Sequence, residues 1–174
     1  FMVLFSTWRC ICFMKKWSVV SILFIMLIGA VACSKETIKE TDVENFVTEY
    51  KKEQYTIKDP SNVPTGEEIA DKVKRYLSKE TFDKQIANRS FDLAPEVASK
   101  TDKSIKLEDV KLKKEKEHDN GSIDYTYTLK LKIGTGQSSD IVEKNGQLTI
   151  SSNDGELKIT RDWEEKAKVG KEIL

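Results

Sequence analysis

A strict alternation of apolar and polar residues over 123–133 constrains the fold more than any other feature of this sequence. Isoleucine, tyrosine or leucine occupies every odd position from Ile123 to Ile133, and aspartate, threonine or lysine occupies every even position between them. Successive side chains of a β-strand point to opposite faces, so the pattern predicts a strand with one face on a core and one in water. Such one-sided burial is typical of antiparallel sheets.

The segment before this strand predicts a second one with an irregularity. Ile105 and Leu107 alternate in one phase, whereas Val110 and Leu112 alternate in the other. An extra residue in a strand reverses its phase, so a β-bulge near 108–109 would keep all four side chains on the core.

Three dipeptides that accept positive φ angles predict tight turns: Asn120-Gly121, Asn145-Gly146 and Asp154-Gly155. The pair Asn145-Gly146 marks either a hairpin or a bulge within one long strand. Gly134-Thr-Gly136 lacks the third glycine of a phosphate-binding loop and leads into another strand, so we interpret it as a turn. A last strand is expected to end at Trp163.

The first half of the chain predicts helices. A capping box at Thr41–Glu44 precedes an apolar stripe, which indicates a helix over about 42–54. After a loop with two prolines, a second capping box at Thr65–Glu68 precedes a stripe from Ile69 to Leu77, which continues at Phe82 and Ile86 after a break at Ser78. Residues 88–104 are expected to form a loop that holds at most a short helical turn.

Two to three N-terminal helices followed by a meander predict an α+β domain, with the helices packed on one face of a curved antiparallel sheet. This order resembles the cystatin-like cone of the nuclear-transport-factor-two-like superfamily, as found in small lipoproteins and cell-surface conjugation proteins of Gram-positive bacteria. Three segments carry the resemblance: Tyr76-Leu77-Ser78 to Phe82, Ile123 to Ile133, and Leu157 to Trp163. Enzymes, binding modules and scaffolds share this fold, so it does not select a function.

The N-terminal region has the layout of an export signal. Lys15 and Lys16 precede an apolar run from Val19 to Ala32, and small residues lead up to Cys33. A cysteine directly after Ala30-Val-Ala resembles the lipobox of bacterial lipoproteins, which implies cleavage before Cys33 and a lipid on its sulfur. The alternative is a transmembrane anchor, for which the apolar run falls short of the roughly 20 residues that a spanning helix needs.

These features divide the chain into four parts. Residues 1–32 are an upstream extension and signal peptide, in which 1–13 are either an upstream extension or a long charged region of the signal. Residues 33–40 are a lipidated tether, 41–165 are a single α+β domain, and 166–174 are a charged tail. The sequence predicts an anchor on the outer face of the cytoplasmic membrane, with two acyl chains for stable attachment.

Charge and residue types exclude several functions. Of the 29 basic residues, three lie in the first 32 positions with none of the 29 acidic ones, so the remainder is mildly acidic and lacks the basic footprint of a nucleic-acid-binding protein. His118 is the sole histidine and falls at a predicted hairpin tip, which disfavours acid–base catalysis. No metal or cofactor site is predicted, because neither a second histidine nor a further cysteine exists after Cys33.

Four aromatic residues are candidates for the lining of a pocket between helices and sheet, where the resembled superfamily binds ligands: Tyr76, Tyr125, Tyr127 and Trp163. The sequence favours a non-catalytic binding or accessory module of an envelope or conjugation assembly, with a protein partner. The alternative is a small-ligand-binding or enzymatic cone that uses this pocket. Two ionisable side chains converging inside the cavity would favour the alternative.

Overall fold

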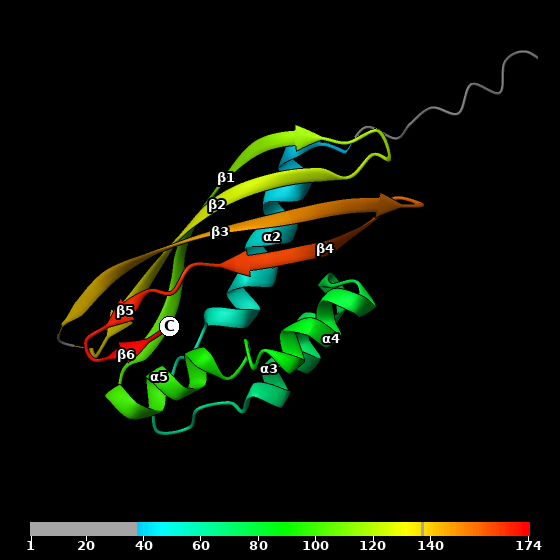
Figure 1. Ribbon diagram of the computed structural model, residues 1–174. Helices are drawn as coiled ribbons and strands as arrows, with labels where there is room; N and C mark the ends of the chain where they lie inside the picture. The colour runs from blue at the N-terminus through cyan, green and yellow to red at the C-terminus, as the bar shows by residue number, and fades with distance from the viewer. Residues whose placement is uncertain (1–37, 137) are drawn as a thin grey trace, which may run out of the picture. The chain divides into compact units, whose positions relative to one another are not determined.

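The computed structural model describes residues 38–136 and 138–174, and the predicted signal segment and Cys33 lie outside them. Four antiparallel strands form one sheet in the order β1-β2-β3-β4: β1 Ser104–Glu117, β2 Ile123–Gly134, β3 Ser139–Asn153 and β4 Glu156–Glu164. The sheet is a curved meander, and α2 (Glu40–Tyr55) runs along one of its faces (Figure 1). The predicted α+β class and the meander are confirmed.

More helices precede the sheet than the two to three expected. The described residues contain α2, α3 (Gly66–Val73), α4 (Lys79–Ala87) and α5 (Leu93–Thr101), with a 3-10 turn at Lys74–Tyr76. The second apolar stripe is divided because Ser78 caps α4, accepting a hydrogen bond from the Thr81 backbone. The segment expected as a loop contains α5, which buries Ala94, Val97 and Ala98.

The two predicted capping boxes have different outcomes. Thr65 caps α3 reciprocally with Glu68, as the sequence predicts. The capping box at Thr41 is wrong, because α2 begins one residue earlier, at Glu40, and its N-cap Lys39 makes no side-chain hydrogen bond.

Strand irregularities place the apolar side chains on the core. The register between β1 and β2 shifts between Leu107 and Asp109, which confirms the predicted bulge. Asn145-Gly146 lies inside the single strand β3, in regular pairing with β2, so it is neither a hairpin nor a bulge. Gly146 is opposite Tyr127, and a Cβ there would lie 2.5 Å from the tyrosine hydroxyl oxygen.

The segment expected as a charged tail folds back onto the domain. Two short strands, β5 (Lys168–Val169) and β6 (Glu172–Ile173), pair around Gly170, whose φ is +64°. The hairpin buries Val169 and Leu174 in the core. Its position beside α5 closes one end of the space between helices and sheet (Figure 1).

Candidate functional site

Four charged side chains meet between α2 and the sheet: Lys51 from α2, Lys144 from β3, and Asp162 and Glu164 from β4. Lys51 Nζ lies 2.7 Å from Asp162 Oδ2 and 2.6 Å from Glu164 Oε1, and Lys144 Nζ lies 3.1 Å from Glu164 Oε2. All four side chains are at most 12% exposed. We call these four residues the buried ionic network.

Three tyrosine hydroxyls complete the hydrogen bonding of the carboxylates. Tyr50 donates to Asp162 Oδ2 (2.7 Å), Tyr55 donates to Glu164, and Tyr127 contacts both carboxylates, at 2.7 and 3.0 Å. Buried charges are tolerated where opposite charges and hydrogen bonds replace water, and each carboxylate oxygen here accepts at least one bond. The network therefore bonds α2 to β4 through fully coordinated carboxylates.

These contacts shift the pKa values of Glu164, Lys51 and the three tyrosines away from neutrality. Burial would raise the pKa of Glu164, but the charges of Lys51 and Lys144 outweigh burial and lower the pKa to about 2. Burial would lower the pKa of Lys51, yet Asp162 and Glu164 leave it above its ordinary value. Burial and then the nearby carboxylates raise the pKa values of Tyr50, Tyr55 and Tyr127 well above 10.0.

A β-bulge explains why two carboxylates of β4 face the core. Ile159 pairs with Ile150 and Arg161 with Thr149, so Thr160 is an extra residue that reverses the phase of the strand. After it, Asp162 pairs with the inward-facing Leu148, whereas Trp163 pairs with Gln147 on the outer face. Uninterrupted alternation from Leu157 and Ile159 would instead turn Trp163 inward.

The four aromatic residues considered as pocket lining do not come together. Tyr76 packs against Phe46 and Tyr50, with ring centroids at 5.3 and 5.8 Å. Tyr125, a residue of β2, is buried in the core. Tyr127 belongs to the network described above, and Trp163 is 53% exposed. Tyr127 and Trp163 line one cavity together, a groove on the outer face of the sheet.

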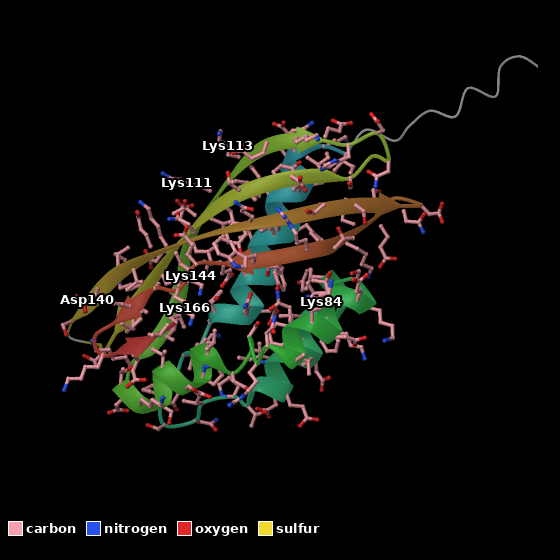
Figure 2. All side chains as sticks on the ribbon, in the orientation of Figure 1. Lys84, Lys111, Lys113, Asp140, Lys144 and Lys166 are labelled. Carbon is pink, nitrogen blue, oxygen red and sulfur yellow. The ribbon has the colours of Figure 1, made fainter. Side chains whose placement is uncertain are left out.

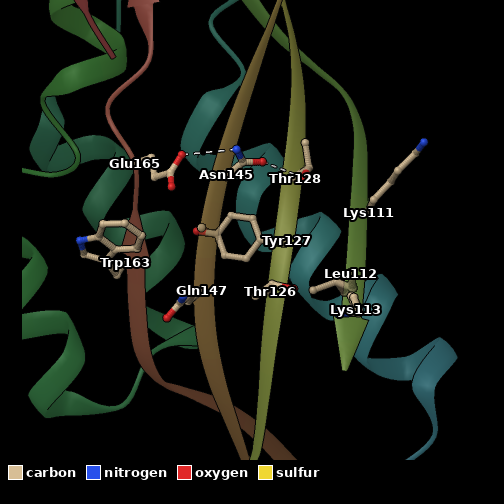
Figure 3. Close-up of a pocket in the computed structure, with 11 residues that line it drawn as sticks. Lys111, Leu112, Lys113, Thr126, Tyr127, Thr128, Asn145, Gln147, Trp163 and Glu165 are labelled. Carbon is tan, nitrogen blue, oxygen red and sulfur yellow. Dashed lines mark hydrogen bonds between the residues drawn. The ribbon is translucent and has the colours of Figure 1, made fainter. Parts of the chain in front are cut away.

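This outer-face groove has a volume of about 410 Å³ and crosses all four strands. Figure 3 shows Lys111 and Lys113 of β1 on one side, Trp163 of β4 on the other, and polar side chains such as Thr126 and Gln147 between them. Several of its polar lining side chains, among them Lys111, Lys113 and Gln147, are exposed, so the groove is open to solvent.

A second cavity, of about 470 Å³, opens between the helices and the sheet, and we call it the inter-layer pocket. Lys144, Asp162 and Glu164 reach it from the sheet, Gln54 and Gln85 from α2 and α4, and residues of the C-terminal hairpin close it. Gln85 Nε2 donates to the Asp162 carbonyl oxygen at 2.8 Å, which ties α4 to the strand beneath the pocket. Ionisable side chains therefore converge at this cavity.

His118 lies at the end of β1, near the predicted hairpin tip. Its Nε2 is 2.8 Å from Asp124 Oδ2, and Thr149 Oγ1 donates to Asp124 Oδ1 at 2.6 Å. Hydrogen bonds from Thr149 and then His118 lower the pKa of Asp124. In the residues that the structure describes, no group of three or more histidine, cysteine, aspartate or glutamate side chains is arranged to hold a metal ion.

Sequence reasoning missed the buried ionic network, although two signals pointed to it. Lys51 follows Val47 by four residues on the apolar stripe of α2, and Lys144 shares the inward phase of Leu148 in β3. Two lysines at core positions require carboxylate partners nearby. The inward position of the two carboxylates could not be predicted, because the apolar–polar alternation of β4 does not indicate the bulge at Thr160.

Comparisons with known proteins concern the fold alone. No protein-family model and no curated protein matches the sequence. An IcmL-like type IV secretion system protein of Legionella pneumophila superposes with a TM-score of 0.57 at 12% identity, over 76% of this chain and 95% of that one. The periplasmic domain of DotI gives 0.53 at 7% identity, over 76% and 99%. The putative transfer protein TraH from the Gram-positive conjugative plasmid pIP501 gives 0.51 at 15% identity, over 78% and 98%.

Proposed function

We propose that this chain is a lipid-anchored, extracytoplasmic accessory module of a secretion or conjugation assembly, in which it binds other proteins and does not catalyse a reaction. The main support for the proposal is the similarity of the fold to those of secretion and transfer proteins. Nearly the full length of an IcmL-like secretion protein, of the DotI periplasmic domain and of the transfer protein TraH superposes on residues of this domain. Because folds host many functions, the chemistry of the site provides the second support.

The groups with shifted pKa values at the buried ionic network are unsuited to acid–base catalysis. A general acid or base works best when its pKa lies near the pH of the reaction. Here the pKa of Glu164 is lowered to about 2, and those of Lys51 and the three tyrosines are raised. These protonation states do not change near neutral pH, which favours a role in holding the domain together.

The anchor rests on the sequence around Cys33. None of the helices in the described residues is long and apolar enough to cross a membrane. A diacylated cysteine would provide stable attachment, since two acyl chains hold a protein where one binds only marginally. We infer that the domain is held on the outer face of the cytoplasmic membrane in this way.

Replacement of the cysteine tests the anchor. In the producing cells, Cys33→Ala should shift the protein from the membrane fraction to the soluble or uncleaved fraction. Mass spectrometry of the native product should find two or three acyl chains on Cys33. An unmodified thiol, or a wild-type protein that fractionates as the variant does, would contradict lipid anchoring.

Crosslinking on intact cells tests the accessory role. A photo-reactive amino acid at Lys113 on the outer-face groove should capture an envelope component of a secretion or conjugation machine. The matched control is the same probe at Lys79, an exposed residue of α4. Identical background from both positions, with no envelope component enriched, would count against the proposal.

The second candidate function is the binding of a small ligand in the inter-layer pocket. The observation that favours it is the convergence of Lys144, Asp162 and Glu164 at one cavity. The inter-layer pocket and the outer-face groove share only Trp163 among their lining residues, so both functions are compatible with one domain.

A further inference from the structure

The carboxylates below the inter-layer pocket are already saturated with donors. Lys51 Nζ directs its three N–H groups to Gln54 Oε1 (3.2 Å), Asp162 and Glu164. Together with Tyr50, Tyr55 and Tyr127, it supplies a donor to each of the four carboxylate oxygens. Neither carboxylate therefore needs a further cation.

Lys144 and Lys166 bring donors to the pocket that this network does not use. An ammonium has three N–H groups, and Lys144, with a side chain only 2% exposed, places one of them near Glu164. The Lys144 ammonium makes no other ion pair or hydrogen bond within residues 38–136 and 138–174, and it lies 5.8 Å from the ring centroid of Tyr55. Lys166 lines the same pocket and has no charged partner in that part of the chain. Figure 2 labels both lysines on the side chains of the domain.

The mouth of the pocket is apolar. Leu93, Trp163, Ile173 and Leu174 line it. Trp163 lies on the edge strand β4 and borders both the outer-face groove and this rim. Trp163 is 53% exposed and Ile173 is 51% exposed, so two of the four large hydrophobic side chains exposed on the described surface border the pocket. Apolar walls with a few converging polar groups, in a volume of about 300–1,000 Å³, are typical of small-molecule sites.

We propose that the inter-layer pocket binds a carboxylate attached to an apolar group, with the carboxylate on Lys144 and Lys166 and the apolar group against Trp163 and Ile173. A cation has no role here, because Asp162 and Glu164 already hold Lys51. The carboxylate is either the end of a peptide with an apolar last residue or a short aliphatic acid. This inference deepens the second candidate function and is independent of the anchor and the protein partner.

Calorimetric titration of the full chain in detergent tests the proposal with matched pairs of probes. The first pair is the tripeptide N-acetyl-Ala-Ala-Leu as free acid and as C-terminal amide, and the second is hexanoate and hexanamide. Charge-assisted hydrogen bonds are about twice as strong as neutral ones, so each acid should bind at least about tenfold more tightly than its amide.

Three variants locate the site. Lys166→Gln removes one of the charges from an exposed side chain and should weaken acid binding by about fivefold to tenfold, and Lys144→Met should weaken it further. Lys111→Gln, on the outer-face groove, should leave binding unchanged. If Lys144→Met fails to fold, Lys166→Gln still tests the proposal, because the Lys166 side chain is exposed and its replacement should leave the domain folded.

The two probe pairs also identify the source of the carboxylate. Tighter binding of the tripeptide acid than of hexanoate assigns a peptide terminus, and equal or weaker binding assigns a free acid.

The proposal is overturned if acids and amides bind alike, if no probe binds, or if Lys166→Gln has no effect. Binding of inorganic phosphate as tight as that of hexanoate would also overturn it, since the apolar rim would then contribute nothing. None of these failures would alter membrane fractionation or crosslinking.

Discussion

Lys51 connects α2 to two strands of the sheet. From the C-terminal half of α2 it contacts two carboxylates of β4 and lies 4.5 and 4.9 Å from the ring centroids of Tyr50 and Tyr127. Its ammonium is fully withdrawn from water, so its desolvation must be offset by these partners. The pairing fixes α2 against the far strand of the sheet as well as against β1.

Removal of this ammonium should strongly destabilise the protein. Lys51→Met preserves the length of the side chain but leaves Asp162 and Glu164 with Lys144 as their sole cation in the network. Leaving a buried charge unpaired costs about 3–5 kcal/mol, so we expect a loss of this size in the free energy of unfolding. Urea denaturation measures it.

The neighbouring lysine provides the control for that substitution. Lys52 is 58% exposed and pairs only with Glu49 on the same helix. Lys52→Met should change stability by less than about 0.5 kcal/mol, as is usual for surface sites. Equal midpoints for the two variants would show that the buried ionic network contributes no net stability.

At the scale of elements, periodicity predicted the strands whose phase it could follow. The bulge in β1 was foreseeable because apolar residues stand on both sides of it and reverse their phase visibly, from Leu107 to Val110. The bulge at Thr160 was not, because polar and charged residues follow it and Asp162 and Glu164 are ordinary surface residues by type. Trp163 was consequently expected inward, whereas the structure turns it to the outer face.

Helix capping separates two threonines that look alike in sequence. Thr65→Ala should lower the free energy of unfolding by about 1 kcal/mol, because it removes the acceptor for the Glu68 backbone N–H at 3.1 Å. Thr41→Ala should cost less than about 0.5 kcal/mol, since Thr41 lies inside α2. Thermal unfolding measures both, and an equal loss would place the start of α2 at Thr41 after all.

At the scale of the whole molecule, the sequence predicted the α+β class and the meander, but not how the space between its layers is filled. Alternation and turn residues determine strand order locally, and both can be recognised in the sequence. The position of α5 and the folding back of 166–174 depend on contacts between distant segments, such as the ion pair between Lys100 of α5 and Glu172 of β6 at 3.2 Å. The inter-layer pocket arises from these segments and was therefore predictable only in its general location.

The stability of the whole domain should depend on pH in the acid range. The pKa of Glu164 is lowered from 4.5 to about 2 on folding, so the folded state binds its proton less readily than the unfolded state. The resulting stability is complete above about pH 4.5 and is lost as the pH falls towards 2. Urea denaturation at pH 7, 4 and 2.5 should show this decline.

A variant separates this carboxyl from the other acidic groups. Glu164→Gln keeps the shape of the side chain and cannot titrate, so its stability should be lower at pH 7 and should fall less between pH 4.5 and 2. Parallel pH curves for the wild type and the variant would contradict the assigned pKa.

The extra residue at Thr160 has a consequence for how this strand tolerates insertions and deletions. Loss of that one residue would close the bulge and leave both faces as they are, because Arg161 would then follow Ile159 in regular alternation, still opposite Thr149. Asp162 would keep its inward position opposite Leu148, and the indole would stay on the outer face. Homologous chains without the bulge should therefore be one residue shorter between Ile159 and Asp162, with the same kinds of side chain on each face.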